Sequence, residues 1–230
     1  GLRTGINQVR HRVTQWTYLS GDRSTSDLDH PNLIIPEWNW NGLQPEPGMR
    51  HAFHAPTLPE LLRAEGYRTL HFGKGHLGAR GTPGADPKAF GYDVRVGGRD
   101  AGGPGSYSGL KNFAANGDLS LPWRAWDVDE WFGQDIHLTE VLTIEAMKHI
   151  RKAVEDEVPF FCMMAHFAPH TPIEPDERFA QAYRDRGYSE AEAAYASLIA
   201  GVDKSTGDLL ALLDELGVAG NTLVVFTSDN

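Results

Sequence analysis

The sequence contains little cysteine and no long apolar segment. Its 230 residues include a single cysteine, Cys162, so no disulfide can form within the chain. This leaves the redox compartment open, because a processed secreted protein can look the same. No apolar run approaches the roughly 20 residues of a membrane-spanning helix, and no signal peptide opens the chain. We therefore expect no membrane span in these residues.

Positive charge is also scarce. Lys and Arg number 21 against 31 Asp and Glu, which gives a formal charge of -10 at pH 7. This balance argues against nucleic acid or an anionic membrane surface as the main partner. It still allows a small anionic substrate that a local cluster of cations would hold. The length suits one substantial core or at most two small ones, and we expect residues 1–230 to form a single domain.

An apolar run over residues 160–165 has the length and composition of a strand buried on both faces. His166 and His170 follow it in a loop whose prolines restrict the backbone. Ligands of open α/β sheets bind just beyond the carboxyl ends of strands, which favours a functional role for the two imidazoles. For either histidine alone, a loop that merely caps polar groups is an equally good interpretation.

The same arrangement precedes this run. A capping box predicts a helix over residues 58–65, and the segment 67–72 after it reads as a strand. That strand leads into Lys74 and His76, which stand among glycines that allow a sharp turn and a close approach to a ligand. Residues 79–131 are rich in glycine and loop-like, and the sequence does not decide whether they form a lid or a plain excursion.

The arrangement appears a third time at the end of the chain. A helix predicted over residues 139–154 feeds the apolar run, and a second capping box at Ser189 opens a long amphipathic helix. Residues 221–228 then read as a strand that leads into Asp229 and Asn230. Alternating helices and buried strands predict an α/β fold, an α/β/α sandwich with a mostly parallel sheet.

The polar clusters suit the hydrolysis of an anionic ester. Asp229 and Asn230 offer hard oxygen ligands, which favour calcium or magnesium over zinc, although an N-cap or a turn explains the pair equally well. Lys74 supplies a compact positive charge for a developing anion. His76 and His170 can exchange protons near neutral pH. Composition and spacing leave sulfate and phosphate esters both open.

Three segments carry a family resemblance. The segment GYRTLHFGKGHLG is similar to the type I sulfatase pattern G-Y-x-T-x-x-x-G-K-W-H-L-G, and HFAPHTPIEP resembles the H-x-P-H-x-P loop of that family. The stretch YASLIAGVDKSTGDLLALLDELGVAGNTLVVFTSDN resembles the family's long helix and metal-binding strand. The resemblance covers most of residues 57–230. It implies the alkaline-phosphatase-like α/β/α fold and hydrolysis of sulfate esters from a carbohydrate or an aryl group.

The resemblance also implies roles for particular residues. Lys74 and His76 would contact the sulfate and the nucleophile's oxygens. His170 would bind the sulfate beside the bridging oxygen and help the leaving group depart, and His166 would reach the substrate. The cofactor would be calcium, or magnesium in its place, with two of its ligands from Asp229 and Asn230.

The sequence departs from the family pattern in two ways. Gly75 stands where the family has tryptophan, which changes packing more than chemistry. The family's nucleophile is a formylglycine made in a C/S-x-P-S-R motif, and this sequence has no such motif; Cys162 has the wrong neighbours. We therefore expect a central part of the catalytic domain, which lacks the nucleophile segment and the C-terminal region and is inactive alone.

Two alternatives remain open at this stage. One is a phosphodiesterase or phosphonate hydrolase of the same superfamily, which would carry threonine as its nucleophile. The other is a non-catalytic relative that keeps the fold and an anion pocket. The resemblance further implies a periplasmic or secreted protein with a sulfated small molecule or glycan as substrate.

Overall fold

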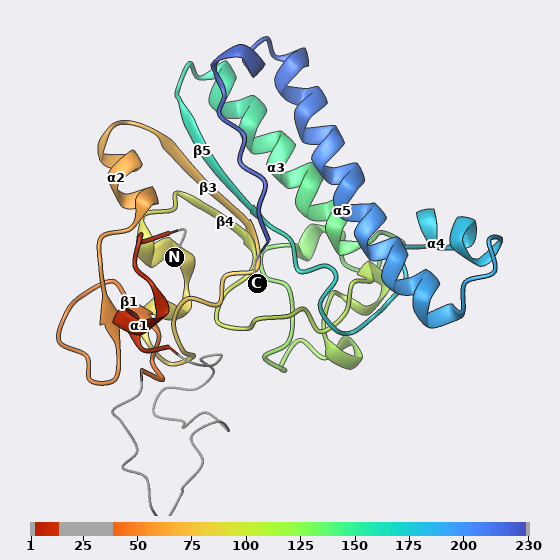
Figure 1. The fold of residues 1–230 in the computed structure, drawn as a ribbon, viewed down its shortest axis with the longest axis horizontal. Coiled ribbons are helices and arrows are strands. Elements are labelled where there is room, and N and C mark those ends of the chain that lie inside the picture. The colour runs from red at the N-terminus through yellow and green to blue at the C-terminus, as the bar shows by residue number, and fades with distance from the viewer. Residues whose placement is uncertain (1–2, 14–38, 229–230) are drawn as a thin grey trace, which may run out of the picture.

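The fold is that of a computed structural model, which describes residues 3–13 and 39–228 (Figure 1). Short 3₁₀ turns lie between several of its regular elements, and the last of them is Ala219–Asn221. The helices and strands are α1 (Gln8–His11), β1 (Leu43–Gln44), β2 (Phe53–His54), α2 (Leu58–Ala64), β3 (Arg68–Gly73), β4 (Val94–Gly97), α3 (Leu138–Glu155), β5 (Phe160–Ala165), α4 (Glu177–Arg184) and α5 (Glu190–Glu215).

The main sheet is parallel and has the strand order β4-β3-β5. The central strand β3 aligns Leu70 with Val94 on one side and with Cys162 on the other. All three strands therefore end at the same edge of the sheet. β1 and β2 form a separate two-stranded parallel pair.

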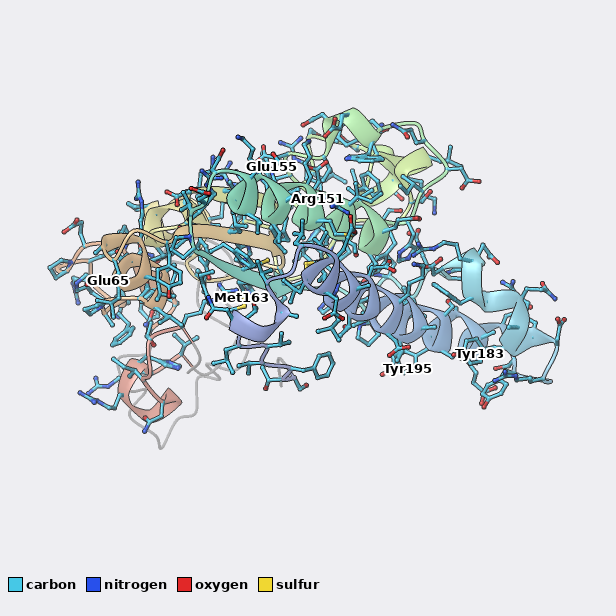
Figure 2. The ribbon with its side chains drawn as sticks, turned by 90° about the horizontal axis from the view of Figure 1, so that it is seen from above. Glu65, Arg151, Glu155, Met163, Tyr183 and Tyr195 are labelled. Atoms are coloured by element: carbon cyan, nitrogen blue, oxygen red, sulfur yellow. The ribbon has the colours of Figure 1, made fainter. Side chains whose placement is uncertain are left out.

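Helices lie on both sides of this sheet (Figure 1). α3 packs against β3 and β5, and α5 packs on α3, while α2 lies on the opposite side. The core between the sheet and α3 includes Leu70, Phe72, Val141 and Leu142, all of which are buried. Seen from above, α5 extends far beyond the sheet to reach α4, and Tyr183 and Tyr195 mark that end (Figure 2). The layered α/β architecture expected from the sequence is confirmed.

Local capping signals set the helix starts as predicted. The Thr57 hydroxyl accepts from the Glu60 amide at 3.4 Å, and the Glu60 carboxylate accepts from the Thr57 amide at 2.8 Å. Ser189 and Glu192 form the same reciprocal pair at the start of α5. Each box satisfies amides that the first helical turn would leave without partners, so these starts depend on residues within one turn.

β5 corrects the expectation of a strand buried on both faces, because it is half-buried along its whole length. Phe160, Cys162 and Met164 pack against the main core, whereas Met163 lies on the side away from α3 (Figure 2). The reason is position: β5 is the last strand of the described sheet, so its outer edge pairs with no strand there. The central strand β3 is the one that is almost fully buried.

The strand expected over residues 221–228 is wrong for the described structure. Asn221 ends a short 3₁₀ turn, and residues 222–228 belong to no helix or strand. The apolar side chains that would have faced a core are exposed, with Leu223 at 89% and Phe226 at 78%. A strand needs a hydrogen-bonded neighbour, and this segment joins no sheet in the part of the chain that the structure describes. In Figure 1 this segment runs in the same direction as β5.

Residues 79–131, expected to be loop-like, contain one short strand. β4 lies in the middle of them, and 3₁₀ turns occupy much of the remainder. Arg95 in β4 is buried and forms ion pairs with Asp86 at 3.2 Å and with Asp127 at 2.9 Å. β4 has only four residues, and one of them is this arginine. The apolar pattern that would have predicted the strand is therefore interrupted.

Candidate functional site

The Lys74 segment and the His166 segment leave the sheet side by side. The Lys74 amide donates to the carbonyl of Ala165 at 2.6 Å, directly after β3 and β5 end. Gly73 makes this crossing possible, because its φ is +91° and an added Cβ would lie 1.9 Å from the Ala165 oxygen. The two motifs recognised in the sequence therefore meet at one edge of the sheet.

His76 is fixed by the chain that follows β4. Its amide donates to the Arg99 carbonyl at 2.6 Å, and its φ is 49°. At Gly75, an added Cβ would lie 2.5 Å from that same carbonyl oxygen and 2.9 Å from Pro87. Backbone and proline thus occupy the space beside residue 75, so a tryptophan there would require these neighbours to move.

His170 is exposed, and its loop fixes which ring nitrogen holds a proton. Nδ1 lies 2.8 Å from the Thr171 carbonyl oxygen. A carbonyl can only accept, so Nδ1 carries hydrogen in this arrangement. Nε2 is then the nitrogen that can gain or lose a proton.

Two consecutive glycines bring His76 and His170 together. A Cβ added to Gly102 would lie 2.5 Å from Nδ1 of His76, and one added to Gly103 would lie 2.7 Å from Nδ1 of His170. Because successive Cα atoms are about 3.8 Å apart, the two imidazoles flank neighbouring residues of one loop. Lys74, His76 and His170 therefore occupy one region at the carboxyl edge of the sheet.

His166 has a different environment. Its Nδ1 is buried without a hydrogen-bond partner in the described structure. Burial, aided by the neighbouring His137, lowers the pKa of His166 to about 4. A neutral imidazole at pH 7 can offer a hydrogen bond to a ligand but no charge.

His137 and Arg3 were not found by reading the sequence. Nδ1 of His137 accepts from the Thr139 amide at 3.2 Å and so caps α3. The Arg3 guanidinium donates to the carbonyls of Gly75 at 3.3 Å and Lys74 at 3.4 Å. The partners of Arg3 lie 71 and 72 positions away in the sequence, so no local pattern could have revealed these contacts.

Glu174 and Tyr107 were missed as well. The Glu174 carboxylate accepts from Ser106 Oγ at 2.6 Å and from the Tyr107 amide at 2.7 Å. The Tyr107 hydroxyl donates to the His170 carbonyl at 3.0 Å. The sequence gives no signal for these contacts, because Glu174 stands beside two other acidic residues, Asp176 and Glu177, and nothing local sets it apart.

The predicted metal ligands Asp229 and Asn230 lie outside the described residues. Among residues 3–13 and 39–228, no three His, Cys, Asp or Glu side chains cluster as a metal site would require. The sulfhydryl of Cys162 is no candidate nucleophile, because burial raises its pKa to about 12 and keeps it protonated at neutral pH.

Fold and site define an α/β protein with histidines and a lysine gathered at the carboxyl edge of a parallel sheet. The chain belongs to the sulfatase family, whose model matches residues 39–230. It is 31% identical to the N-acetylgalactosamine-6-sulfatase of Mus musculus over 182 residues, which cover 75% of this chain and 32% of that protein. It is 28% identical to the arylsulfatase of Klebsiella aerogenes over 231 residues, or 76% of this chain and 47% of that one.

Two solved structures have a similar fold. Ps i-CgsB in complex with k-i-k-neocarrahexaose superposes with a TM-score of 0.57 and 26% identity, over 71% of this chain and 37% of that one. The PsFucS1 sulfatase from Pseudoalteromonas sp. gives a TM-score of 0.57 at 20% identity, over 94% and 41%. The fold is thus the alkaline-phosphatase-like α/β/α fold of sulfatases. The chain spans about a third of the length of the N-acetylgalactosamine-6-sulfatases it matches.

Proposed function

We propose that the complete protein hydrolyses sulfate esters, with Lys74, His76 and His170 lining the pocket for the sulfate group. The observation that carries this proposal is the meeting of the two motif loops: the Lys74 amide bonds to Ala165, and both imidazoles flank one glycine pair. Membership of the sulfatase family supports it. Residues 1–230 would form part of one catalytic domain.

Each of these side chains has a distinct task in the proposed reaction. The Lys74 ammonium would neutralise oxygens of the sulfate on which charge builds as the ester bond breaks. His76, held by the Arg99 carbonyl, would hydrogen-bond the sulfate or the nucleophile's oxygen. His166 is proposed as a neutral hydrogen-bonding contact toward the substrate, in keeping with its lowered pKa.

His170 would deliver a proton to the leaving group. Since its Nδ1 hydrogen bonds to the Thr171 carbonyl, protonation and deprotonation take place at Nε2. An oxygen that leaves as an alkoxide or phenoxide gains stability when it takes up a proton as the ester bond breaks. The side chain is exposed, so a substrate can reach it.

The proposal includes a metal and a modified nucleophile. Asp229 and Asn230 would supply oxygen ligands to calcium or magnesium, which suits their chemistry. The metal would add positive charge near the sulfate, and a formylglycine outside residues 1–230 would supply the attacking oxygen. Metal analysis of the purified protein and mass spectrometry of its nucleophile peptide test these two points directly.

We further propose a sulfated carbohydrate or aryl ester as substrate. Two matched proteins support this class, one named N-acetylgalactosamine-6-sulfatase and one determined in complex with k-i-k-neocarrahexaose. A periplasmic or secreted location is part of the proposal. In the described part of the chain, no helix combines the length and apolar character needed to cross a membrane. Cell fractionation would test the location.

The decisive experiment compares 4-nitrophenyl sulfate with 4-nitrophenyl phosphate as substrates of the complete gene product. We expect turnover of the sulfate ester and loss of that turnover in Lys74→Ala. Preference for the phosphate would instead support the phosphoesterase alternative. Turnover of neither ester, together with no release of sulfate from sulfated saccharides, would support a non-catalytic anion-binding relative. Purified residues 1–230 alone should turn over neither ester, and activity from them would contradict the proposed location of the nucleophile.

A further inference from the structure

The loop that contributes the glycine pair is tied to the His170 loop through one carboxylate. Residues 101–108, here called the glycine-rich loop, lie opposite the segment that follows His170. Glu174 accepts from Ser106 Oγ at 2.6 Å and from the Tyr107 amide at 2.7 Å. Lys111 Nζ donates to the other carboxylate oxygen at 2.7 Å. Both oxygens of Glu174 are therefore used to join segments more than sixty residues apart in sequence.

Glu174 remains ionised in this environment. Partial burial by itself raises the pKa of the carboxyl group, but the hydrogen bonds from Lys111, Ser106 and the Tyr107 amide outweigh it and lower the pKa below its usual value. Hydrogen bonds to an ionised acceptor are shorter and stronger than neutral ones. The carboxylate is thus a strong link between the two loops at neutral pH.

Tyr107 makes a second link, directly to the backbone of His170. Its hydroxyl donates to the His170 carbonyl at 3.0 Å. The side chain is fully buried, and its ring stacks on His137 with centroids 5.0 Å apart and planes at 8°. The Tyr107 carbonyl accepts from the Leu138 amide at 2.8 Å, at the start of α3. His170 is therefore anchored through Tyr107 to a main helix of the fold.

Gly102 and Gly103 complete the arrangement because a side chain at either position would have to displace an imidazole. Hypothetical Cβ atoms would lie 2.5 Å from His76 Nδ1 and 2.7 Å from His170 Nδ1, closer than real Cβ atoms come to other atoms. Neither glycine has a positive φ, so an alanine there would meet no backbone strain but would have to displace the imidazole beside it. The absence of a side chain lets the loop backbone lie against both rings.

We propose that the glycine-rich loop is a wall of the sulfate pocket and that Tyr107 and Glu174 are positioning residues that hold His170 against it. This inference rests on the proposed function of the same site. Tyr107 and Glu174 act only through His170: they set where its Nε2 lies relative to the leaving oxygen. The wall itself sets the separation of His76 and His170.

The consequence for the reaction depends on the leaving group. A displaced His170 transfers its proton less well, which matters most when the departing oxygen is strongly basic. Phenyl sulfate has a more basic leaving group than 4-nitrophenyl sulfate. Substitutions in the glycine-rich loop or at the positioning residues should therefore slow the hydrolysis of phenyl sulfate more than that of 4-nitrophenyl sulfate.

The test uses the complete gene product and both aryl sulfates. We expect Gly103→Ala to lower kcat for phenyl sulfate by about 10²-fold, since a displacement of roughly 1 Å can have that effect. The loss for 4-nitrophenyl sulfate should be several times smaller, with little change in KM for either ester. Gly207→Ala is the matched control, because that glycine lies in α5 with open space around it and no positive φ.

The positioning residues are tested by graded replacements. Tyr107→Phe removes only the hydroxyl. We expect it to slow the hydrolysis of phenyl sulfate more than that of 4-nitrophenyl sulfate. Glu174→Ala should do the same, and Glu174→Gln should recover much of the rate because an amide oxygen still accepts from Ser106 and the Tyr107 amide. Tyr195→Phe, on the exposed side of α5, is the control for the loss of a hydroxyl.

Equal losses on the two esters, or losses that follow a fall in melting temperature alone, would overturn the positioning role. If the kinetics of Gly103→Ala were indistinguishable from those of Gly207→Ala, the glycine-rich loop would not be a wall of the sulfate pocket. A second measurement does not depend on turnover: NMR titration of the imidazoles with sodium sulfate. Sulfate should shift His76 and His170 together in the wild type, and Gly102→Ala should weaken that response; an unchanged response would contradict the proposal even if no ester is hydrolysed.

Discussion

The Arg3 guanidinium lies 3.1 Å from Nε2 of His71, a histidine with no exposed surface. A guanidinium can only donate, so Nε2 accepts and the ring is neutral with its hydrogen on Nδ1. Burial, together with the positive charges of Arg3 and Arg95, holds the pKa of His71 well below its usual value. A neutral histidine inside β3 thus holds the arginine that also bonds to the Lys74 and Gly75 carbonyls.

Arg3→Ala should loosen the Lys74 segment. The substitution removes donors from two carbonyls and leaves the His71 acceptor buried without a partner, which costs about 1–3 kcal/mol. Urea unfolding should register that loss, and amide exchange at Lys74 and Gly75 should accelerate. Arg10→Ala, at an exposed position of α1, is the control. Unchanged exchange at Gly75 would show that Arg3 does not hold this segment.

Gly73→Ala should be among the most destabilising single substitutions in the chain. It adds a Cβ that would lie 1.9 Å from the Ala165 oxygen, and it does so at a φ of +91°. Relief requires β3 and β5 to separate where they end, so we expect at least about 3 kcal/mol of lost stability. Thermal or urea unfolding measures it against Gly207→Ala, which has no such neighbour. Equal stability of the two variants would mean that the crossing of the loops is not tight.

Cys162 should resist thiol reagents in the folded chain. Burial raises its pKa to about 12, so the reactive thiolate is almost absent at pH 8. We expect negligible reaction with Ellman's reagent under native conditions and one equivalent in urea, which serves as the positive control. Rapid reaction of the native protein would show that β5 opens readily from the sheet.

The sequence could predict the features that depend on residues close together in the chain. The capping boxes at Thr57 and Ser189 predicted helix starts correctly because their partners lie within one turn. The parallel sheet followed from the alternation of helices and apolar strands. The sequence predicted polar clusters at the carboxyl ends of successive strands of one sheet, but not the contacts that hold them, since the contact of Glu174 with Tyr107 joins residues 67 positions apart. Such contacts depend on tertiary structure, which no local pattern encodes.

The strand predicted over residues 221–228 shows the opposite limitation. Its apolar, β-branched composition is typical of a strand, yet Leu223 and Phe226 are exposed and the segment joins no described sheet. β-propensity reflects how a side chain fits a pleated and half-buried surface, so it takes effect only where a neighbouring strand provides one. Residues 222–228 have the composition without that neighbour in the described structure.

Stability should fall with acid in a window set by buried imidazoles, which include His137 and His166 as well as His71. Burial lowers the pKa of His137 to about 4, although Asp176 opposes it, and the pKa of His166 is likewise lowered to about 4. Unfolded histidines titrate near 6.5, so the unfolded state binds more protons as the pH falls from there. Folding stability is therefore fully present above about pH 6.5 and declines toward pH 4.

His137→Asn should flatten this decline while keeping a side-chain cap for α3, since asparagine is a good N-cap residue. Urea unfolding at pH 7.5, 6.0 and 4.5 measures the slope for wild type and variant. Carboxylates contribute equally to both proteins, so the difference between the slopes isolates the imidazole. Parallel slopes would mean that His137 is not neutral in the folded protein.

Lys74→Ala should abolish most activity without unfolding the protein. The side chain is half-buried beside the site, and its amide rather than its ammonium makes the bond to Ala165, so the backbone crossing survives the substitution. Removing one preorganised group that stabilises developing charge typically costs about 10²–10³-fold in kcat. We expect a loss of that size on 4-nitrophenyl sulfate, with Lys204→Ala, whose ammonium pairs with Asp208 on the surface of α5, as the control. A loss below about threefold would remove Lys74 from the sulfate pocket, because a group that meets the sulfate directly cannot be that dispensable.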